Sequence, residues 1–116
     1  AKHVAETELN WLRMAQQQPN EKARDESNWA ESFRLVGDET VKGVLEFWDG
    51  VVAEVEAFIR AVPSLDDTFP LPEAPWNEPG GEWSVRRVLT HVLTETAQHA
   101  GHADILRETL DGRRAT

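Results

Sequence analysis

The chain has 116 residues, a formal net charge of −9, 40% hydrophobic and 28% charged residues, and no cysteine. This length and composition suit one globular domain, which we expect to span residues 1–116. The negative charge argues against nucleic-acid and membrane partners, and the lack of cysteine excludes disulfides, thiolate metal sites and a cysteine nucleophile.

The chain shows no targeting or membrane segment. No apolar run reaches the roughly 18 residues of a membrane span, and the first residues lack the basic-then-apolar order of a signal peptide. We therefore expect a cytoplasmic protein.

The first predicted helix covers about residues 1–18 and ends before Pro19. Its apolar positions form a broken stripe: Val4, Ala5, Leu9, Leu12 and Ala15. The polar segment 20–38 follows, and its apolar residues are Trp29, Phe33 and Leu35. We expect this segment to contain a short helix or turn that packs on the neighbouring helices.

The second predicted helix has Asp38 or Thr40 as its N-cap and ends at Pro63. Apolar residues recur at three- and four-residue steps throughout it, so we expect a helix that serves only the core. Residues 63–83 then hold five of the six prolines of the chain. Because proline interrupts helices and central strands, this segment is predicted to be a long crossover loop.

The last predicted helix has Ser84 as its N-cap, runs to about Leu110 and stops at Gly112. At about 100° per residue its apolar positions fall within one arc of about 80°. These positions are Val88, Val92, Thr96, Ala103, Leu106 and Leu110. His99 lies inside the same arc, so we expect its side chain in the core.

Glu95 lies at the edge of this arc, with His102 and His91 farther round the same side. A carboxylate on a core-facing flank loses several kcal/mol of hydration unless a cation or an ion pair replaces it. Glu95 and His99 are four residues apart, so an oxygen and a nitrogen can reach one cation. If the first and last helices pack side by side, His3 comes to the same point. Two histidines and one carboxylate leave coordination positions open, as in catalytic metal sites.

Spacing alone leaves other roles open. A buried histidine satisfied by an ordinary hydrogen bond is one alternative for His99, and a solvated side chain is one for His3. We expect His91 and His102 to support the site through hydrogen bonds to Glu95 or to substrate, because metal-bound groups need such partners. His102 is also a candidate fourth ligand.

The chain resembles the DinB-like bacterial four-helix bundles in three segments: Lys2–Ala5 with Glu8, Trp83–Leu89 and Glu95–Leu106. The resemblance covers nearly the whole chain and is most specific between Glu95 and Gly112. It implies an all-α fold with up-down-down-up topology and one divalent metal ion, typically zinc or nickel, on His3, Glu95 and His99. Many relatives have histidine at the position of Glu95, but the related mycothiol-dependent maleylpyruvate isomerases have glutamate.

The resemblance also implies a small-molecule substrate and a low-molecular-weight thiol cosubstrate, because several relatives are transferases or isomerases that use mycothiol, bacillithiol or glutathione. The absence of cysteine is compatible with an external thiol. Two alternatives remain: a metal-dependent hydrolase, in which the ion lowers the pKa of bound water, and a non-catalytic bundle that binds a small ligand or a partner protein.

One departure concerns the start of the chain. DinB-like proteins have a helix before the one that carries the first histidine, whereas this sequence begins two residues ahead of His3 and without methionine. We expect either that the sequence is a piece of a longer protein or that another chain completes the bundle, and we favour the first. A homodimer is also expected, because three helices with a four-helix pattern expose apolar surface that promotes association.

Overall fold

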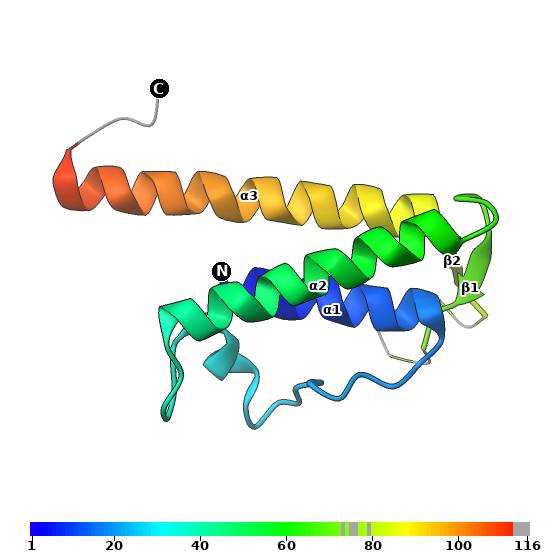
Figure 1. Ribbon diagram of the computed structural model, residues 1–116, viewed down its shortest axis with the longest axis horizontal. Helices are drawn as coiled ribbons and strands as arrows, with labels where there is room; N and C mark the ends of the chain where they lie inside the picture. The colour runs from blue at the N-terminus through cyan, green and yellow to red at the C-terminus, as the bar shows by residue number, and fades with distance from the viewer. Residues whose placement is uncertain (73, 75–76, 79, 113–116) are drawn as a thin grey trace.

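The computed structural model describes residues 1–72, 74, 77–78 and 80–112. In this part of the chain the order of elements is α1 (Lys2–Gln16), the 3-10 helix η1 (Trp29–Phe33), α2 (Val41–Ala61), β1 (Thr68–Pro70), β2 (Glu82–Ser84) and α3 (Val85–Asp111). Figure 1 shows α1 and α2 running in the same direction and α3 running in the opposite one. The molecule is therefore mostly helical, and no helix within the described ranges is long and apolar enough to cross a membrane.

The ends of the two longer helices follow from capping residues. The hydroxyl of Thr40 accepts a hydrogen bond from the backbone N–H of Gly43, and that of Ser84 accepts one from Arg87. Gly112 ends α3 in the left-handed conformation, with φ of 71°. The predicted caps of these helices are confirmed.

The first helix ends slightly earlier than predicted. Gln17 adopts a left-handed conformation with φ of 56°, so α1 stops at Gln16 rather than near residue 18. The short helix expected in residues 20–38 is confirmed as η1.

Helix α1 is the central element because it packs against both α2 and α3. Its buried apolar residues are Val4, Ala5, Leu9 and Leu12, at helical spacing. Val51 of α2 joins Leu9 and Leu12 in one cluster, and Val85 and Val88 are the buried residues of α3. Full burial of one such side chain contributes roughly 1.5–3 kcal/mol. This packing holds the start of α1 beside the middle of α3.

The prediction that residues 63–83 form only a loop is incomplete. β1 and β2 pair in antiparallel register, with Phe69 opposite Trp83, and the side chain of Phe69 is buried. Pro70 is tolerated because a two-stranded sheet consists only of edge strands. Part of the predicted loop, residues 73, 75–76 and 79, lies outside the described residues.

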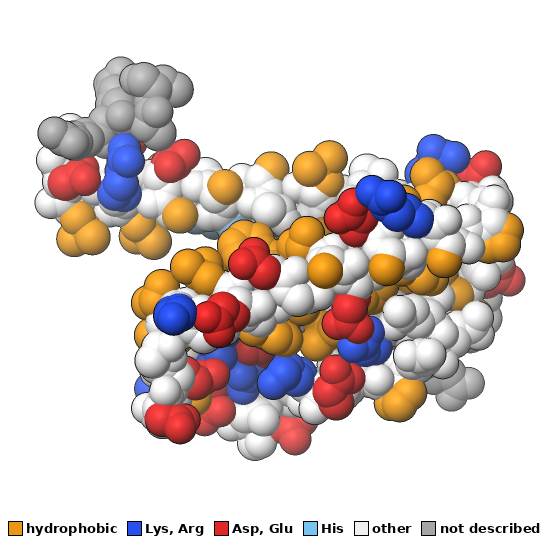
Figure 2. Space-filling view, in the orientation of Figure 1, with side chains coloured by type: hydrophobic (Ala, Val, Ile, Leu, Met, Phe, Trp, Pro, Cys, Tyr) orange, Lys and Arg blue, Asp and Glu red, His pale blue; other side chains and the backbone are white. Residues whose placement is uncertain are grey.

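The predicted apolar arc of α3 is buried only in its N-terminal half. Val88 is 4% exposed, whereas Leu106 is 66% and Leu110 is 87% exposed. The C-terminal turns of α3 extend past the start of α1 in Figure 1, and apolar side chains are visible along their underside in Figure 2. A helical arc shows which residues share a face, but the burial of that face depends on which element packs against it.

Candidate metal centre

His3, Glu95 and His99 lie together between α1 and α3. Each offers one ligand atom, and these three atoms lie within 4.8 Å of one another. The rings of His3 and His99 are 4.9 Å apart between centroids, at an angle of 71°. The antiparallel packing of α1 on α3 thus brings a residue from the start of the chain to a pair on adjacent turns of the last helix.

The cluster is half-buried, and the prediction that the side chain of His99 lies in the core is wrong. The side chains of Glu95 and His99 are 34% and 35% exposed. Helix α1 covers one flank of α3 here, and α3 packs mainly on α1 rather than on α2. The remaining exposure leaves the cluster accessible to a ligand from outside.

The surroundings of His3 favour its neutral form. Burial lowers the pKa of His3 below 6.5, and the nearby His99 lowers it further against the opposing effect of Glu95. Nδ1 of His3 lies 3.1 Å from the hydroxyl oxygen of Ser32, so one ring nitrogen has a hydrogen-bonding partner. A neutral imidazole fixed in this way is the form that coordinates metals.

Lys2 fixes the segment that carries Ser32. Its side chain is 8% exposed, and its ammonium donates to the backbone carbonyl oxygens of Glu31 and Arg34 at 2.6 and 2.9 Å. It also donates to the carboxylate of Glu39 at 2.7 Å. A buried ammonium requires such acceptors, so the three bonds hold η1 and the segment after it, up to residue 39, against the start of α1.

Phe33 covers one face of the His3 ring. The two rings are stacked, with centroids 4.2 Å apart and planes 22° from parallel. The sequence indicates that the segment of Phe33 packs on the neighbouring helices, but it does not reveal the contacts of Phe33 and Ser32 with His3. Both contacts join residues about thirty positions apart, and no local spacing indicates such pairs.

His91 lies beside Glu95 on the side away from His99. Its Nε2 is 3.3 Å from Oε1 of Glu95, while Oε2 of Glu95 is 3.7 Å from Nε2 of His99. The ring of His91 makes edge contacts with Trp11 and Trp83, which stack on each other at 4.5 Å. The position of His91 agrees with the predicted hydrogen bond to Glu95, and its supporting role stays a prediction.

His102 is exposed and lies one turn farther along α3, with its ring centroid 6.3 Å from that of His99. It is not among the three residues whose ligand atoms meet. Its predicted role, as a fourth ligand or as a substrate contact, stays a prediction.

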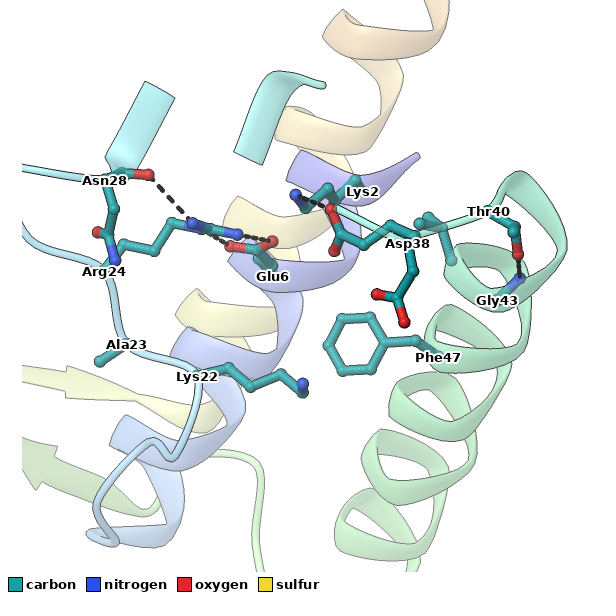
Figure 3. Close-up of a pocket in the computed structure, with 12 residues that line it drawn as sticks. Lys2, Glu6, Lys22, Ala23, Arg24, Asn28, Asp38, Thr40, Gly43 and Phe47 are labelled. Carbon is teal, nitrogen blue, oxygen red and sulfur yellow. Dashed lines mark hydrogen bonds and ion pairs between the residues drawn. The ribbon is translucent and has the colours of Figure 1, made fainter. Parts of the chain in front are cut away.

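A separate cavity of about 490 Å³ lies between α1, α2 and residues 22–28. Figure 3 shows Arg24 directed at Glu6, with dashed lines joining the two side chains. Four charged side chains of this cavity form two ion pairs, Arg24 with Glu6 and Lys2 with Glu39. We interpret this network as the contact that attaches residues 20–39 to α1.

The donor set fits a divalent transition metal. Two imidazoles and one carboxylate suit zinc, nickel, iron and manganese alike. Atoms bound to one such ion at about 2.1 Å lie roughly 3 to 3.5 Å apart. The distance between Oε2 of Glu95 and Nε2 of His99, 3.7 Å, is already close to this range.

The family model described as mycothiol-S-transferase matches residues 1–112. This family is DinB-like, so the match confirms the resemblance to that superfamily. No curated protein and no solved structure matches the chain significantly.

Proposed function

Because this chain belongs to the mycothiol-S-transferase family, we propose that it transfers a low-molecular-weight thiol, mycothiol or one of the bacillithiol type, to an electrophilic small molecule. An isomerase that adds the thiol and releases it again is a variant of the same chemistry. The proposal is supported by one observation above all, the convergence of His3, Glu95 and His99 at a half-buried point.

We propose that these three side chains hold one divalent ion, with zinc and nickel as the first candidates. When bound there, the ion would coordinate the sulfur of the thiol and stabilise its thiolate at neutral pH. Ser32 occupies Nδ1 of His3 and leaves Nε2 for ligation. His91 occupies Oε1 of Glu95 and leaves Oε2 on the side of His99. Three protein ligands and partial exposure leave room for the sulfur.

A thiol-transfer assay tests this function. The protein is loaded with zinc or nickel and incubated with mycothiol and an uncharged electrophile, and the thioether is measured by mass spectrometry. We expect a thioether above the spontaneous rate, lost in His99→Ala and retained in Gln98→Ala, which changes an exposed neighbour on α3. Absence of a thioether with a panel of electrophiles would contradict the proposal, and hydrolysis of a test ester or amide by the same protein would favour a metal-dependent hydrolase.

We propose further that α1, α2 and α3 correspond to the last three helices of an up-down-down-up four-helix bundle. Their directions agree with this topology. The exposed apolar residues of α3 support a homodimer: Leu93, Ile105, Leu106 and Leu110. A cytoplasmic location fits a reaction that needs a reduced thiol. Light scattering after size-exclusion chromatography tests the dimer.

A further inference from the structure

Two tryptophans and a histidine form an aromatic cluster that joins three elements: Trp11 of α1, Trp83 of β2 and His91 of α3. The indole rings of Trp11 and Trp83 stack, with centroids 4.5 Å apart and planes 11° from parallel. The imidazole of His91 lies at a steep angle to both rings, with centroid distances of 4.9 Å to Trp11 and 5.4 Å to Trp83. Contacts of this kind are favourable and directional, so the stack restricts the orientation of the imidazole.

Trp83 is fixed by contacts other than the one with His91. It lies opposite Phe69 in the two-stranded sheet, and Phe69 is 2% exposed. The guanidinium of Arg87 lies over the ring of Trp83, 4.2 Å from its centroid, which is a favourable cation–π contact. Figure 1 shows the sheet beside the end of α1 and the start of α3, and each of these helices contacts one of its strands. The sheet therefore supplies a fixed indole ring against which His91 packs.

His91 connects this aromatic cluster to the candidate metal centre. Its Nε2 lies 3.3 Å from Oε1 of Glu95, one turn farther along α3. The side chain of His91 is 34% exposed, so its own helix leaves the ring room to adopt another rotamer. The contact with Glu95 therefore depends on the neighbours that hold the ring, and these neighbours are Trp11 and Trp83.

The orientation of Glu95 is important because its two oxygens face different histidines. Oε2 lies 3.7 Å from Nε2 of His99, whereas Oε1 faces His91. Loss of a partner that orients a metal ligand typically weakens metal affinity roughly 10- to 100-fold. A change in the indole stack should therefore reach the metal centre through two contacts, the first from tryptophan to His91 and the second from His91 to Glu95.

We propose that Trp11 and Trp83 are positioning residues of the metal centre and that they act through His91. The stacked indoles fix the imidazole, the imidazole fixes Oε1 of Glu95, and Oε2 stays on the side of His99. The two-stranded sheet thereby contributes to metal affinity from outside the group of ligand residues. This inference rests on the proposed metal centre.

Zinc affinity, measured by competition with a chelator, tests this inference without turnover. Trp83→Leu removes an aromatic ring and should weaken zinc binding about tenfold or more, because His91 then loses part of its support. Trp83→Phe keeps an aromatic face and should bring the affinity back to within about threefold of the unmodified protein. Trp11→Leu removes the other indole and should also weaken binding, so it serves as the second variant if Trp83→Leu does not fold.

A double-mutant cycle with His91 separates positioning from general stabilisation. His91→Ala should weaken zinc binding by itself, and adding Trp83→Leu should then change the affinity by no more than about twofold, because the tryptophan acts through the imidazole that has been removed. The free energy of unfolding in urea should fall on adding Trp83→Leu both with and without His91, since the stack with Trp11 is lost in either case.

Val51→Ala is the control for loss of stability. Val51 is 1% exposed and belongs to the core cluster of α1 and α2. Its truncation should lower the free energy of unfolding and leave zinc affinity within about twofold. Circular dichroism checks that each variant is folded under the conditions of the zinc titration.

Three results would overturn the inference: unchanged zinc affinity in Trp83→Leu and Trp11→Leu, a loss of the same size with and without His91, or an equal loss in Val51→Ala. If one of these occurs while zinc binding still depends on His99, the metal centre stands and only the positioning role fails. If the unmodified protein binds no zinc, the metal centre and this inference fail together.

Discussion

Ser32 and His3 form the contact on which the orientation of the first imidazole depends. The hydroxyl of Ser32 lies 3.1 Å from Nδ1, and Ser32 itself is buried. Partners of this kind fix the ring and the tautomer of a metal-binding histidine. Ser32→Ala should therefore weaken metal affinity by about 10- to 100-fold, measured by competition with a chelator. Ser27→Ala, an exposed serine of the same segment, is the control and should leave the affinity unchanged.

At the scale of single residues, the sequence is sufficient to predict the pair of Glu95 and His99 on α3. It is not sufficient to predict the side chains that surround this pair. The four-residue spacing of Glu95 and His99 requires only a helix to bring the two side chains to one side. His3 was selected through the resemblance, because no local pattern connects residues so far apart. Ser32 and Phe33 depend on how η1 docks, which is a property of tertiary packing.

Lys2 and Glu39 connect two elements, and their pair makes stability depend on pH. The ammonium of Lys2 holds the pKa of the Glu39 carboxyl below its ordinary value of 4.5. Below 4.5 the unfolded chain therefore binds more protons at this group than the folded chain does. The stabilisation is present above pH 4.5 and is lost as the pH falls through the lower, folded value. We expect the urea midpoint of the unmodified chain to decline between pH 5 and pH 3, and Glu39→Gln should flatten this decline; an unchanged decline would contradict the role of this pair.

Removal of Lys2 should loosen η1 from α1. Lys2→Met leaves two carbonyl oxygens without their donor, and the loss of one buried partner costs about 1–3 kcal/mol. We expect a lower free energy of unfolding in urea, together with weaker metal binding because Ser32 shifts with η1. Lys42→Met, at an exposed position of α2, should change neither quantity.

Truncation of a buried apolar side chain of α1 should lower the unfolding free energy more than truncation of an exposed one at the end of α3. Leu9→Ala removes a fully buried side chain and should cost about 2–5 kcal/mol of unfolding free energy. In protein dilute enough to be monomeric, Leu110→Ala should stay within about 0.5 kcal/mol, because Leu110 is 87% exposed in the single chain. A large effect of Leu110→Ala in dilute protein would show that the end of α3 is covered in solution.

At the scale of elements, the caps and apolar periods were sufficient to predict α2 and α3 closely. Thr40, Ser84 and Gly112 act locally, so their effects are readable along the chain. The strands β1 and β2 were missed because each has three residues and one contains Pro70. The exposure of the C-terminal half of α3 was not predicted. The apolar periodicity of a helix gives no information about which element, if any, packs against its apolar face.

In the whole molecule, helix α1 determines how the other helices are placed, because it packs on both α2 and α3. It also brings His3 next to Glu95 and His99. Membership of the mycothiol-S-transferase family gives this geometry its proposed chemistry, the transfer of a low-molecular-weight thiol.

Elemental analysis of the purified protein beside His99→Ala tests the metal centre most directly. We expect one divalent ion per chain in the unmodified protein and its loss in the variant, with both proteins folded by circular dichroism. Absence of metal from the unmodified protein, even after zinc or nickel is added and the excess is removed, would contradict it.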